Sequence, residues 1–198
     1  MIAIIDYDAG NLKSVEKALN SLGHETVVSR DSSVILEADK VILPGVGSFG
    51  DAMNNLDHFG LVDTIKKVAA SKTPFLGICL GLQLLFERSD ETPGAEGLSI
   101  LPGQILRIPP SNDLKIPHMG WNSISNINSA LFKGIDEESY VYFVHSYYVP
   151  CNKFTTSQCN YTVNFSASIE HDNFMAVQFH PEKSGKTGEL ILKNFLEL

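Results

Sequence analysis

The sequence has few cysteines and a deficit of positive charge. Its 198 residues include three cysteines, Cys79, Cys151 and Cys159, and no two of them have CxxC spacing. An odd number of cysteines without that spacing supports neither a disulfide framework nor a zinc site. Lysine and arginine number 15 against 23 acidic residues, so the formal net charge is -8. Because nucleic acids are bound through clustered basic side chains, this balance argues against a nucleic-acid partner.

Membrane-spanning and export signals are also lacking. The longest nearly uncharged apolar run covers residues 74–86, which is too short to span a bilayer, and it contains Gln83. The first five residues carry no basic group and are followed by Asp6, so they are typical of a first strand and not of a signal peptide. We therefore expect a cytoplasmic protein that has no membrane partner.

Alternation of strand and helix patterns dominates the first half. Short runs rich in β-branched residues alternate with helical periodicity at residues 2–6, 11–22, 26–29, 40–43, from about 51, and 74–78. This order predicts an α/β fold of three layers, with a twisted, mostly parallel central sheet flanked by helices. No polar, low-complexity linker divides the chain, so we expect one domain over residues 1–198.

The second half has a different pattern. Residues 100–179 contain more aromatic side chains and little helical periodicity, which predicts antiparallel strands and hairpins. The last fourteen residues return to a helical pattern, with Leu190, Ile191, Phe195 and Leu198 at core-facing spacing.

A possible nucleophile stands at Cys79, between two glycines in Gly77-Ile-Cys79-Leu-Gly81. This is the form of a nucleophile elbow, where a strand turns so sharply into a helix that larger neighbours would collide. The N–H groups of the new helix would favour a thiolate and the oxyanion that forms when it attacks a carbonyl. The same five residues also fit a buried structural cysteine in an apolar strand.

A glycine-rich turn follows the third predicted strand, in Pro44-Gly-Val-Gly-Ser-Phe-Gly50. It matches GxGxxG, but a dinucleotide-binding turn follows the first strand, and the acid about twenty residues on, Asp63, lies in a helical pattern. We interpret the turn as a loop whose amides serve an anion, with a plain connection as the alternative.

The third segment of interest is Gln178-Phe-His-Pro-Glu-Lys-Ser184. If it is extended, His180 and Glu182 lie on one face, where the carboxylate could orient the imidazole. All three segments are expected at carboxyl ends of strands, where sites of parallel sheets gather. No histidine pair has metal-ligand spacing and no GxxxxGK loop occurs, so we expect neither a metal nor a cofactor.

The glycine loop, the cysteine elbow and the His-x-Glu segment, in this order along the chain, resemble the class I (triad) glutamine amidotransferases over nearly the whole chain. The resemblance implies Cys79 as nucleophile, His180 as base and Glu182 as its orienter. It also implies that the oxyanion is held by backbone amides of Gly47 and Leu80. The glutamine substrate would contact Gln83, His145, Ser146 and Tyr147, the last three mainly through their main chain.

Within that family, the segments 44–50, 115–122 and 142–147 resemble the glutaminase subunits of imidazole glycerol phosphate synthases, enzymes of histidine biosynthesis. The resemblance implies a heterodimer with a (β/α)₈-barrel cyclase, which receives the ammonia directly. Five residues match family positions at or near that interface: Met119, Trp121, Asn122, Tyr142 and Lys183.

Other interpretations stay open at this stage. The chain could be a glutaminase that feeds a different synthase, for example one that modifies a sugar, or a non-catalytic regulatory subunit of amidotransferase type. A cysteine hydrolase of another substrate is a further alternative. Glycine at both 45 and 47 also permits a peptide flip, so the oxyanion amide of this loop could be presented only after the partner has bound its own ligand.

Overall fold

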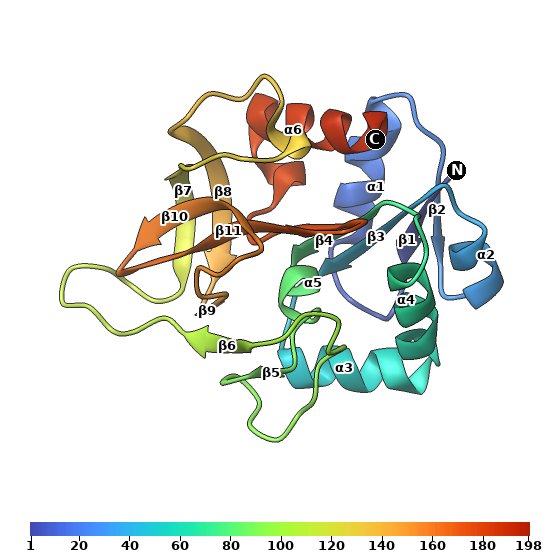
Figure 1. Ribbon diagram of the computed structural model, residues 1–198, viewed down its shortest axis with the longest axis horizontal. Helices are drawn as coiled ribbons and strands as arrows, with labels where there is room; N and C mark the ends of the chain where they lie inside the picture. Colours follow the sequence, from blue (N-terminus) through green and yellow to red (C-terminus); the bar gives the residue numbers. More distant parts are fainter.

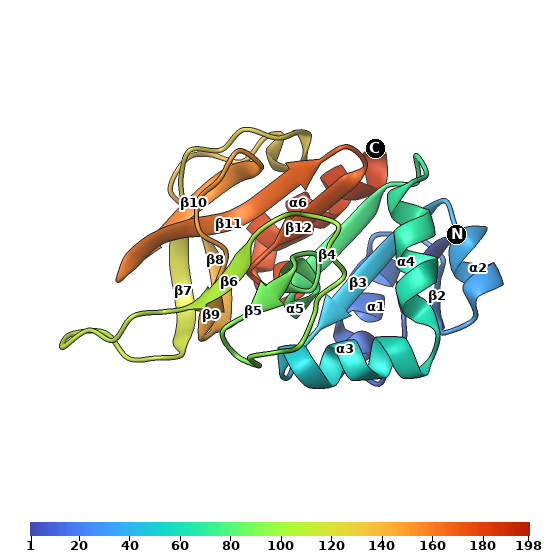
Figure 2. The ribbon, with the colours of Figure 1, turned by 60° about the horizontal axis from the view of Figure 1, so that its bottom comes forward.

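A seven-stranded sheet forms the centre of the computed structural model, which describes residues 1–198. Its strand order is β10-β11-β12-β4-β3-β1-β2 (Figures 1 and 2). Five strands are parallel: β1 (Ile2–Ile5), β2 (Thr26–Ser29), β3 (Lys40–Gly45), β4 (Phe75–Cys79) and β12 (Phe174–Val177). The strands β11 (Val163–His171) and β10 (Thr155–Tyr161) extend the sheet in antiparallel pairing. The predicted mostly parallel sheet is confirmed.

Helices cover both faces of this sheet (Figures 1 and 2). One face carries α1 (Leu12–Ser21) and α6 (Gly185–Glu197), whose apolar side chains share a core with Ile2 and Ile4. The other carries α2 (Ser32–Leu36), α3 (Phe49–His58) and α4 (Leu61–Ala69), which pack with Ala3 and Ile5. Successive residues of β1 point to opposite faces of the sheet, and helices cover both faces. β1 is therefore buried over its whole length, as is usual for an inner parallel strand.

Smaller sheets lie beside the central one in the second half. β7 (His118–Ile124) and β8 (Ser139–His145) form an antiparallel pair of their own, and β6 (Gln104–Arg107) joins β5 (Arg88–Ser89) to β9 (Tyr147–Tyr148). Two short 3₁₀ turns, η1 (Ala130–Phe132) and η2 (Pro181–Lys183), and the four-residue α5 (Leu80–Gln83) complete the elements. The expectation of antiparallel strands in this half holds for β7, β8, β10 and β11.

The second half departs from the expectations at two places. β12 pairs antiparallel with β11, as expected, but on its other side it pairs in parallel with β4, and all four of its side chains are buried between these neighbours. In α6 the core-facing set is Ile191, Leu192, Phe195 and Leu196, whereas Leu190 is half-buried and Leu198 exposed. Leu198 lies beyond the end of the helix, so helical spacing no longer sets its direction.

The register of the sheet brings the three predicted segments to one edge. Gly45, at the end of β3, is the partner of Cys79, at the end of β4. Val177, at the end of β12, is the partner of Ile78 on the other side. None of the helices has the length and apolarity that crossing a bilayer requires.

Candidate active site

The turn at Cys79 has the geometry of a nucleophile elbow. Cys79 ends β4 and immediately precedes α5, with φ 55° and ψ -107°. A Cβ on Gly81 would lie 1.9 Å from the carbonyl oxygen of Leu43, and one on Gly77 would lie 2.9 Å from that of Gly81. Both flanking positions therefore require glycine, because strand and helix approach too closely for any side chain.

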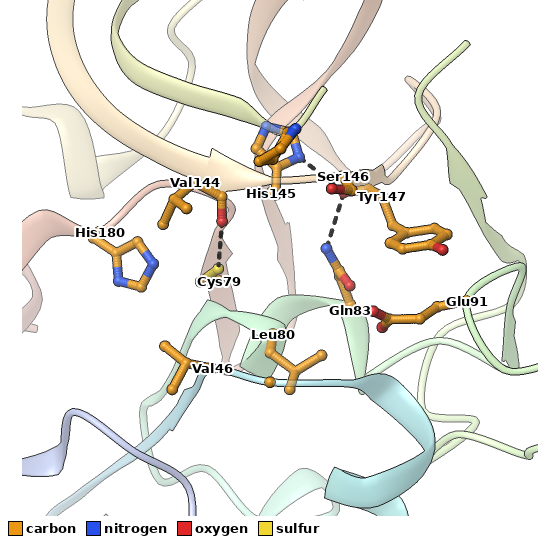
Figure 3. A pocket seen from close by; sticks show the side chains of 12 residues that line it. Val46, Cys79, Leu80, Gln83, Glu91, Val144, His145, Ser146, Tyr147 and His180 are labelled. Carbon is orange, nitrogen blue, oxygen red and sulfur yellow. Dashed lines mark hydrogen bonds between the residues drawn. The ribbon is translucent and has the colours of Figure 1, made fainter. Parts of the chain in front are cut away.

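The thiol faces a cavity of about 300 Å³ between the sheet edge and the segment 144–147 (Figure 3). Most of the residues singled out from the sequence line it together with Cys79. They are Gly47, Leu80, Gln83, His145, Ser146, Tyr147 and His180. Val46, Glu91, Pro117 and Val144 complete the wall. The fold thus gathers into one pocket groups that are far apart in the sequence.

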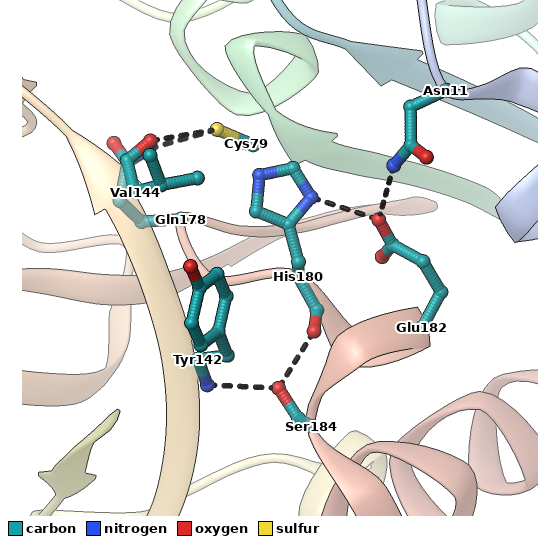
Figure 4. Close-up of polar contacts among 8 residues, drawn as sticks. All are labelled: Asn11, Cys79, Tyr142, Val144, Gln178, His180, Glu182 and Ser184. Atoms are coloured by element: carbon teal, nitrogen blue, oxygen red, sulfur yellow. Dashed lines mark hydrogen bonds and ion pairs between the residues drawn. The ribbon is translucent and has the colours of Figure 1, made fainter. Parts of the chain in front are cut away.

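The imidazole of His180 is held from behind by Glu182. Its Nδ1 lies 2.8 Å from Oε1 of Glu182, and both side chains are buried (Figure 4). The extended arrangement considered for this segment does not occur: His180 precedes the 3₁₀ turn η2, and this turn places the carboxylate beside the ring. Ser184 fixes the same corner, since its hydroxyl donates to the carbonyl of His180 and accepts from the amide of Tyr142.

The charge state of His180 depends on its two neighbours. Burial lowers the pKa of His180, but contacts with Cys79 and Glu182 outweigh burial and raise that pKa to about 10. Nε2 has no hydrogen-bond partner in the protein and lies on the side of the ring that faces Cys79 (Figure 4). This nitrogen is free to exchange a proton with the sulfur or with a bound molecule.

Asn11 is a site residue that sequence reasoning missed. It precedes α1 with φ 73°, and its side chain makes no capping hydrogen bond to that helix. Instead its Nδ2 donates to Oε1 of Glu182 over 2.8 Å. The carboxylate oxygen that holds His180 is therefore itself held in place (Figure 4).

Gln83 occupies the pocket wall in a constrained position. Its Nε2 donates to the carbonyl of Tyr147 and to Oε1 of Gln178, each over 3.0 Å. With both N–H groups used inside the protein, only Oε1 of Gln83 is left for a ligand.

Two buried histidines continue this network away from the cavity. His145 Nδ1 donates to the carbonyl of Tyr147 over 2.8 Å, so its Nε2 must accept, and His118 Nδ1 donates to it over 2.9 Å. Asn122 Nδ2 lies 3.3 Å from the remaining nitrogen of His118. Burial lowers the pKa of His118 to about 4 and that of His145 to about 3, so both rings are neutral.

Glu91 adds an acidic group to the cavity that no sequence pattern indicated. It accepts a hydrogen bond of 2.8 Å from the amide of Phe49, and burial raises the pKa of its carboxyl group. Phe49 and Gly50, at the start of α3, donate to Glu91 and Thr92. A phosphate at the GxGxxG turn would have to displace these bonds, which argues against a dinucleotide site there.

The loop at 44–47 is anchored at one end and open at the other. Tyr7 donates its hydroxyl to the carbonyl of Pro44 over 2.8 Å, and a Cβ on Gly45 would lie 2.4 Å from that hydroxyl. Gly47 has φ 107° and no atom within 4 Å of the position that a Cβ would take. Glycine is thus required at 45 by close contact and at 47 by backbone conformation.

Comparison with known proteins decides the family. The family model for glutamine amidotransferase class-I matches residues 3–198. The chain belongs to the class-I glutamine amidotransferases. Imidazole glycerol phosphate synthase subunit HisH of Bacteroides thetaiotaomicron is 48% identical to this amidotransferase over 100% of the chain and 99% of the relative. HisH of Methanocaldococcus jannaschii is also 48% identical, and the match covers both chains completely.

Solved structures of low identity share the fold of this amidotransferase. A crystal structure of a glutamine amidotransferase has a TM-score of 0.76 at 16% identity, covering 100% of this chain and 98% of the other. The structure of PurLQS from Thermotoga maritima contains a chain with a TM-score of 0.72 at 19% identity, covering 99% of this chain and 97% of that one.

The residues expected at a partner interface gather on the β7–β8 hairpin of the amidotransferase. Trp121 pairs directly with Tyr142, and their rings lie edge to face with centroids 6.1 Å apart. The exposed fractions are 62% for Met119 and 54% for Trp121, which are large for apolar side chains. Lys183 is exposed on η2, whereas Asn122 is half-buried and donates to the carbonyl of Asn160.

Proposed function

We propose that this chain is the glutaminase subunit of an imidazole glycerol phosphate synthase, in which it hydrolyses glutamine to glutamate and ammonia. Relatives that carry that name are about 48% identical over the full length. The observation that carries the chemical part is the buried pair of His180 and Glu182 beside Cys79, at the edge of one cavity.

The proton of the Cys79 sulfur is held on Nε2 of His180, whose raised pKa keeps it there. The thiolate attacks the carboxamide carbon of glutamine, and the resulting oxyanion is bound by backbone amides of Gly47 and Leu80. His180 then returns the proton to the leaving nitrogen, ammonia departs and a glutamyl thioester remains. Water, deprotonated by His180, attacks the thioester and releases glutamate. Glu182 stabilises the imidazolium that forms twice in this cycle.

The substrate is held by groups along the cavity wall. We place Oε1 of Gln83 and the main chain of residues 145–147 against the bound glutamine, as the family resemblance implies, and all four residues line the cavity. Glu91 provides a carboxylate at the same cavity, which suits the ammonium group at the amino-acid end of glutamine. The roles at 145–147 use backbone groups, so side-chain variants there report poorly on binding.

The ammonia passes to a cyclase subunit with a (β/α)₈ barrel, which forms imidazole glycerol phosphate and aminoimidazole carboxamide ribotide. The docking surface consists of the exposed face of the β7–β8 hairpin, with Met119, Trp121 and Tyr142, and of Lys183 beside it. Its aromatic character is typical of the centre of protein interfaces. Both subunits act in the cytoplasm, and the two chains form a heterodimer.

The test measures glutamate release by the chain alone, with the cyclase, and with the cyclase plus its ribotide ligand. We expect little activity from the chain alone and a large increase in the third condition, because the 45–47 loop then presents its amide. Strong constitutive activity of the isolated chain would sink the loop hypothesis. If the cyclase neither binds nor activates the chain, the acceptor is a different synthase.

Cys79→Ala separates the two halves of the reaction. We expect it to abolish product formation from glutamine in the heterodimer and to leave formation from added ammonium salt intact. Cys151→Ser, at an exposed thiol outside the cavity, serves as the matched control and keeps both activities. Glutamine-dependent turnover that survives in Cys79→Ala contradicts the assignment of the nucleophile.

A further inference from the structure

Gln178 contacts the sulfur of Cys79 and has no role in the mechanism above. It follows β12, its side chain is fully buried, and its Nε2 lies 3.7 Å from Sγ of Cys79. We propose that Gln178 is a further catalytic residue, whose amide donates a hydrogen bond to the thiolate of Cys79 and is oriented for this by Gln83. The inference deepens the proposed glutaminase function and rests on it.

The direction of the Gln178 amide is set by its other partner. Both N–H groups of Gln83 are used, one on the carbonyl of Tyr147 and one on Oε1 of Gln178. If the Gln178 amide were turned over, its Nε2 would face Nε2 of Gln83, and two donors would meet in a buried place. The N–H of Gln178 therefore points at the sulfur, and its oxygen points away.

The remaining contacts of the sulfur explain what this donor does. The carbonyl oxygen of Val144 lies 3.9 Å from Sγ, which suits a thiol but repels a thiolate. Gln178 has the opposite preference, because an N–H stabilises the negative sulfur. Nε2 of Gln178 makes no hydrogen bond other than the one to Sγ, and a neutral sulfur is a weak acceptor. The N–H of Gln178 that points at Sγ therefore has a strong acceptor only when Cys79 is ionised.

The chain offers a direct readout of thiolate formation. Alkylation by iodoacetamide follows the thiolate, so its rate against pH gives the midpoint for Cys79 in the full chain without glutamine or partner. Cys151 is exposed and is replaced by serine in every variant. Cys159 is buried, and burial raises its pKa to about 12, so it stays unreactive over the range measured.

Two variants of Gln178 are compared in this background. Gln178→Leu removes the donor at similar volume, and we expect its alkylation midpoint to rise by roughly one pH unit, which corresponds to about a tenfold lower thiolate population below the midpoint. Gln178→Glu retains the shape but faces the sulfur with a carboxylate, and we expect a larger rise. The matched control is Gln104→Leu, at an exposed glutamine on β6, which should leave the midpoint unchanged.

Glutaminase kinetics of the heterodimer complete the test. We expect Gln178→Leu to lower kcat with little change in KM, and to move the acid limb of the pH profile upward. A folded Gln178→Leu chain with the midpoint of the parent overturns the proposal, as does a folded Gln178→Glu chain with that midpoint if the leucine variant does not fold. A failure of the proposed function is distinguishable from a failure of this proposal, because the parent heterodimer would then lack glutaminase activity whatever the alkylation midpoints are.

Discussion

Cys79 has a backbone conformation that costs energy in any residue with a side chain. Its φ of 55° and ψ of -107° arise from the turn between β4 and α5, which glycines on both sides allow. Non-glycine residues in such regions cost about 1–3 kcal/mol each, which the surrounding packing has to offset. The Cys79 thiol is thus presented to the cavity at the expense of stability.

This cost predicts a difference between two inactive variants. Cys79→Ala retains a Cβ and its strain, whereas Cys79→Gly removes both. We expect the free energy of unfolding of Cys79→Gly to exceed that of Cys79→Ala by about 1 kcal/mol, even though glycine carries more entropy in the unfolded chain. Urea unfolding of both variants measures the difference, and a glycine variant of equal or lower stability would contradict the strain.

Motif spacing predicted some site residues and could not predict others. Cys79, His180 and Glu182 stand in local patterns whose chemistry is recognisable one segment at a time. Asn11 follows a glycine before a helix and has the pattern of an N-cap. Its side-chain amide instead donates a hydrogen bond to Glu182, which lies near the other end of the chain. Gln178 and Glu91 likewise acquire their roles only through long-range contacts, which a sequence without coordinates does not specify.

At the scale of elements, the order of strands and helices was predictable and the pairing was not. β-branched runs located β1 to β4 within two residues, because buried parallel strands leave a continuous apolar signal. The apolar run at 174–177 has no feature that gives the direction of the strand beside it. That β12 lies parallel to β4 follows from the crossover between them, which involves the whole second half of the chain.

The contact between α6 and η2 sets the position of Glu182. A Cβ on Gly188 would lie 1.9 Å from the carbonyl oxygen of Pro181. Helix propensity alone favours Gly188→Ala by about 1 kcal/mol, but overpacking costs about 1–3 kcal/mol, so we expect a net loss of stability. Glutaminase activity should fall as well, because η2 has to move away and takes the carboxylate with it.

Urea unfolding and glutamate release check this contact, with Lys186→Ala at an exposed position of the same helix as control. A Gly188→Ala variant that is more stable than the parent and fully active would show that η2 shifts without loss of stability or activity, and would contradict this prediction.

The β7–β8 hairpin carries a separate prediction. Trp121 is 54% exposed, so Trp121→Ala removes little buried area in the chain itself. In the heterodimer the same change empties the centre of the proposed docking surface, and we expect Kd to rise roughly 30-fold or more, as for an interface hot spot. Calorimetric titration with the cyclase measures this loss. Leu114→Ala, at an exposed apolar residue outside the hairpin, should bind like the parent, and equal affinity of both variants would remove Trp121 from the interface.

At the scale of the whole molecule, the buried histidines link folding to pH. His118 and His145 have pKa values of about 4 and 3 in the folded chain, below the ordinary value of 6.5, because burial disfavours their charged forms. As pH falls from 6.5 toward 4, the unfolded chain binds protons that the folded chain refuses. The free energy of unfolding then falls by up to about 1.4 kcal/mol per pH unit for each histidine. His180, whose pKa is raised, contributes in the opposite sense, and its contribution is lost as pH rises from 6.5 through about 10.

Urea unfolding of the parent and of His118→Gln between pH 7 and 4.5 isolates one of these protons. Carboxylates and His180 contribute to both chains alike, so the difference in slope belongs to His118 and to its effect on His145. We expect the variant to have the shallower loss of stability on acidification. If the free energy of unfolding falls with the same slope in both chains, His118 is protonated in the folded protein.

The β7–β8 hairpin forms a sheet of its own, and the bridge between Ser125 and Gln158 and the hydrogen bond from Asn122 to the carbonyl of Asn160 join it to the edge strand β10. The hairpin also reaches the cavity, because Val144 and His145 stand at the end of β8 and line the wall beside Cys79. The proposed docking surface and the proposed glutamine site thus share one strand. We therefore expect that exchange of the whole hairpin would change the choice of acceptor and the binding of glutamine together.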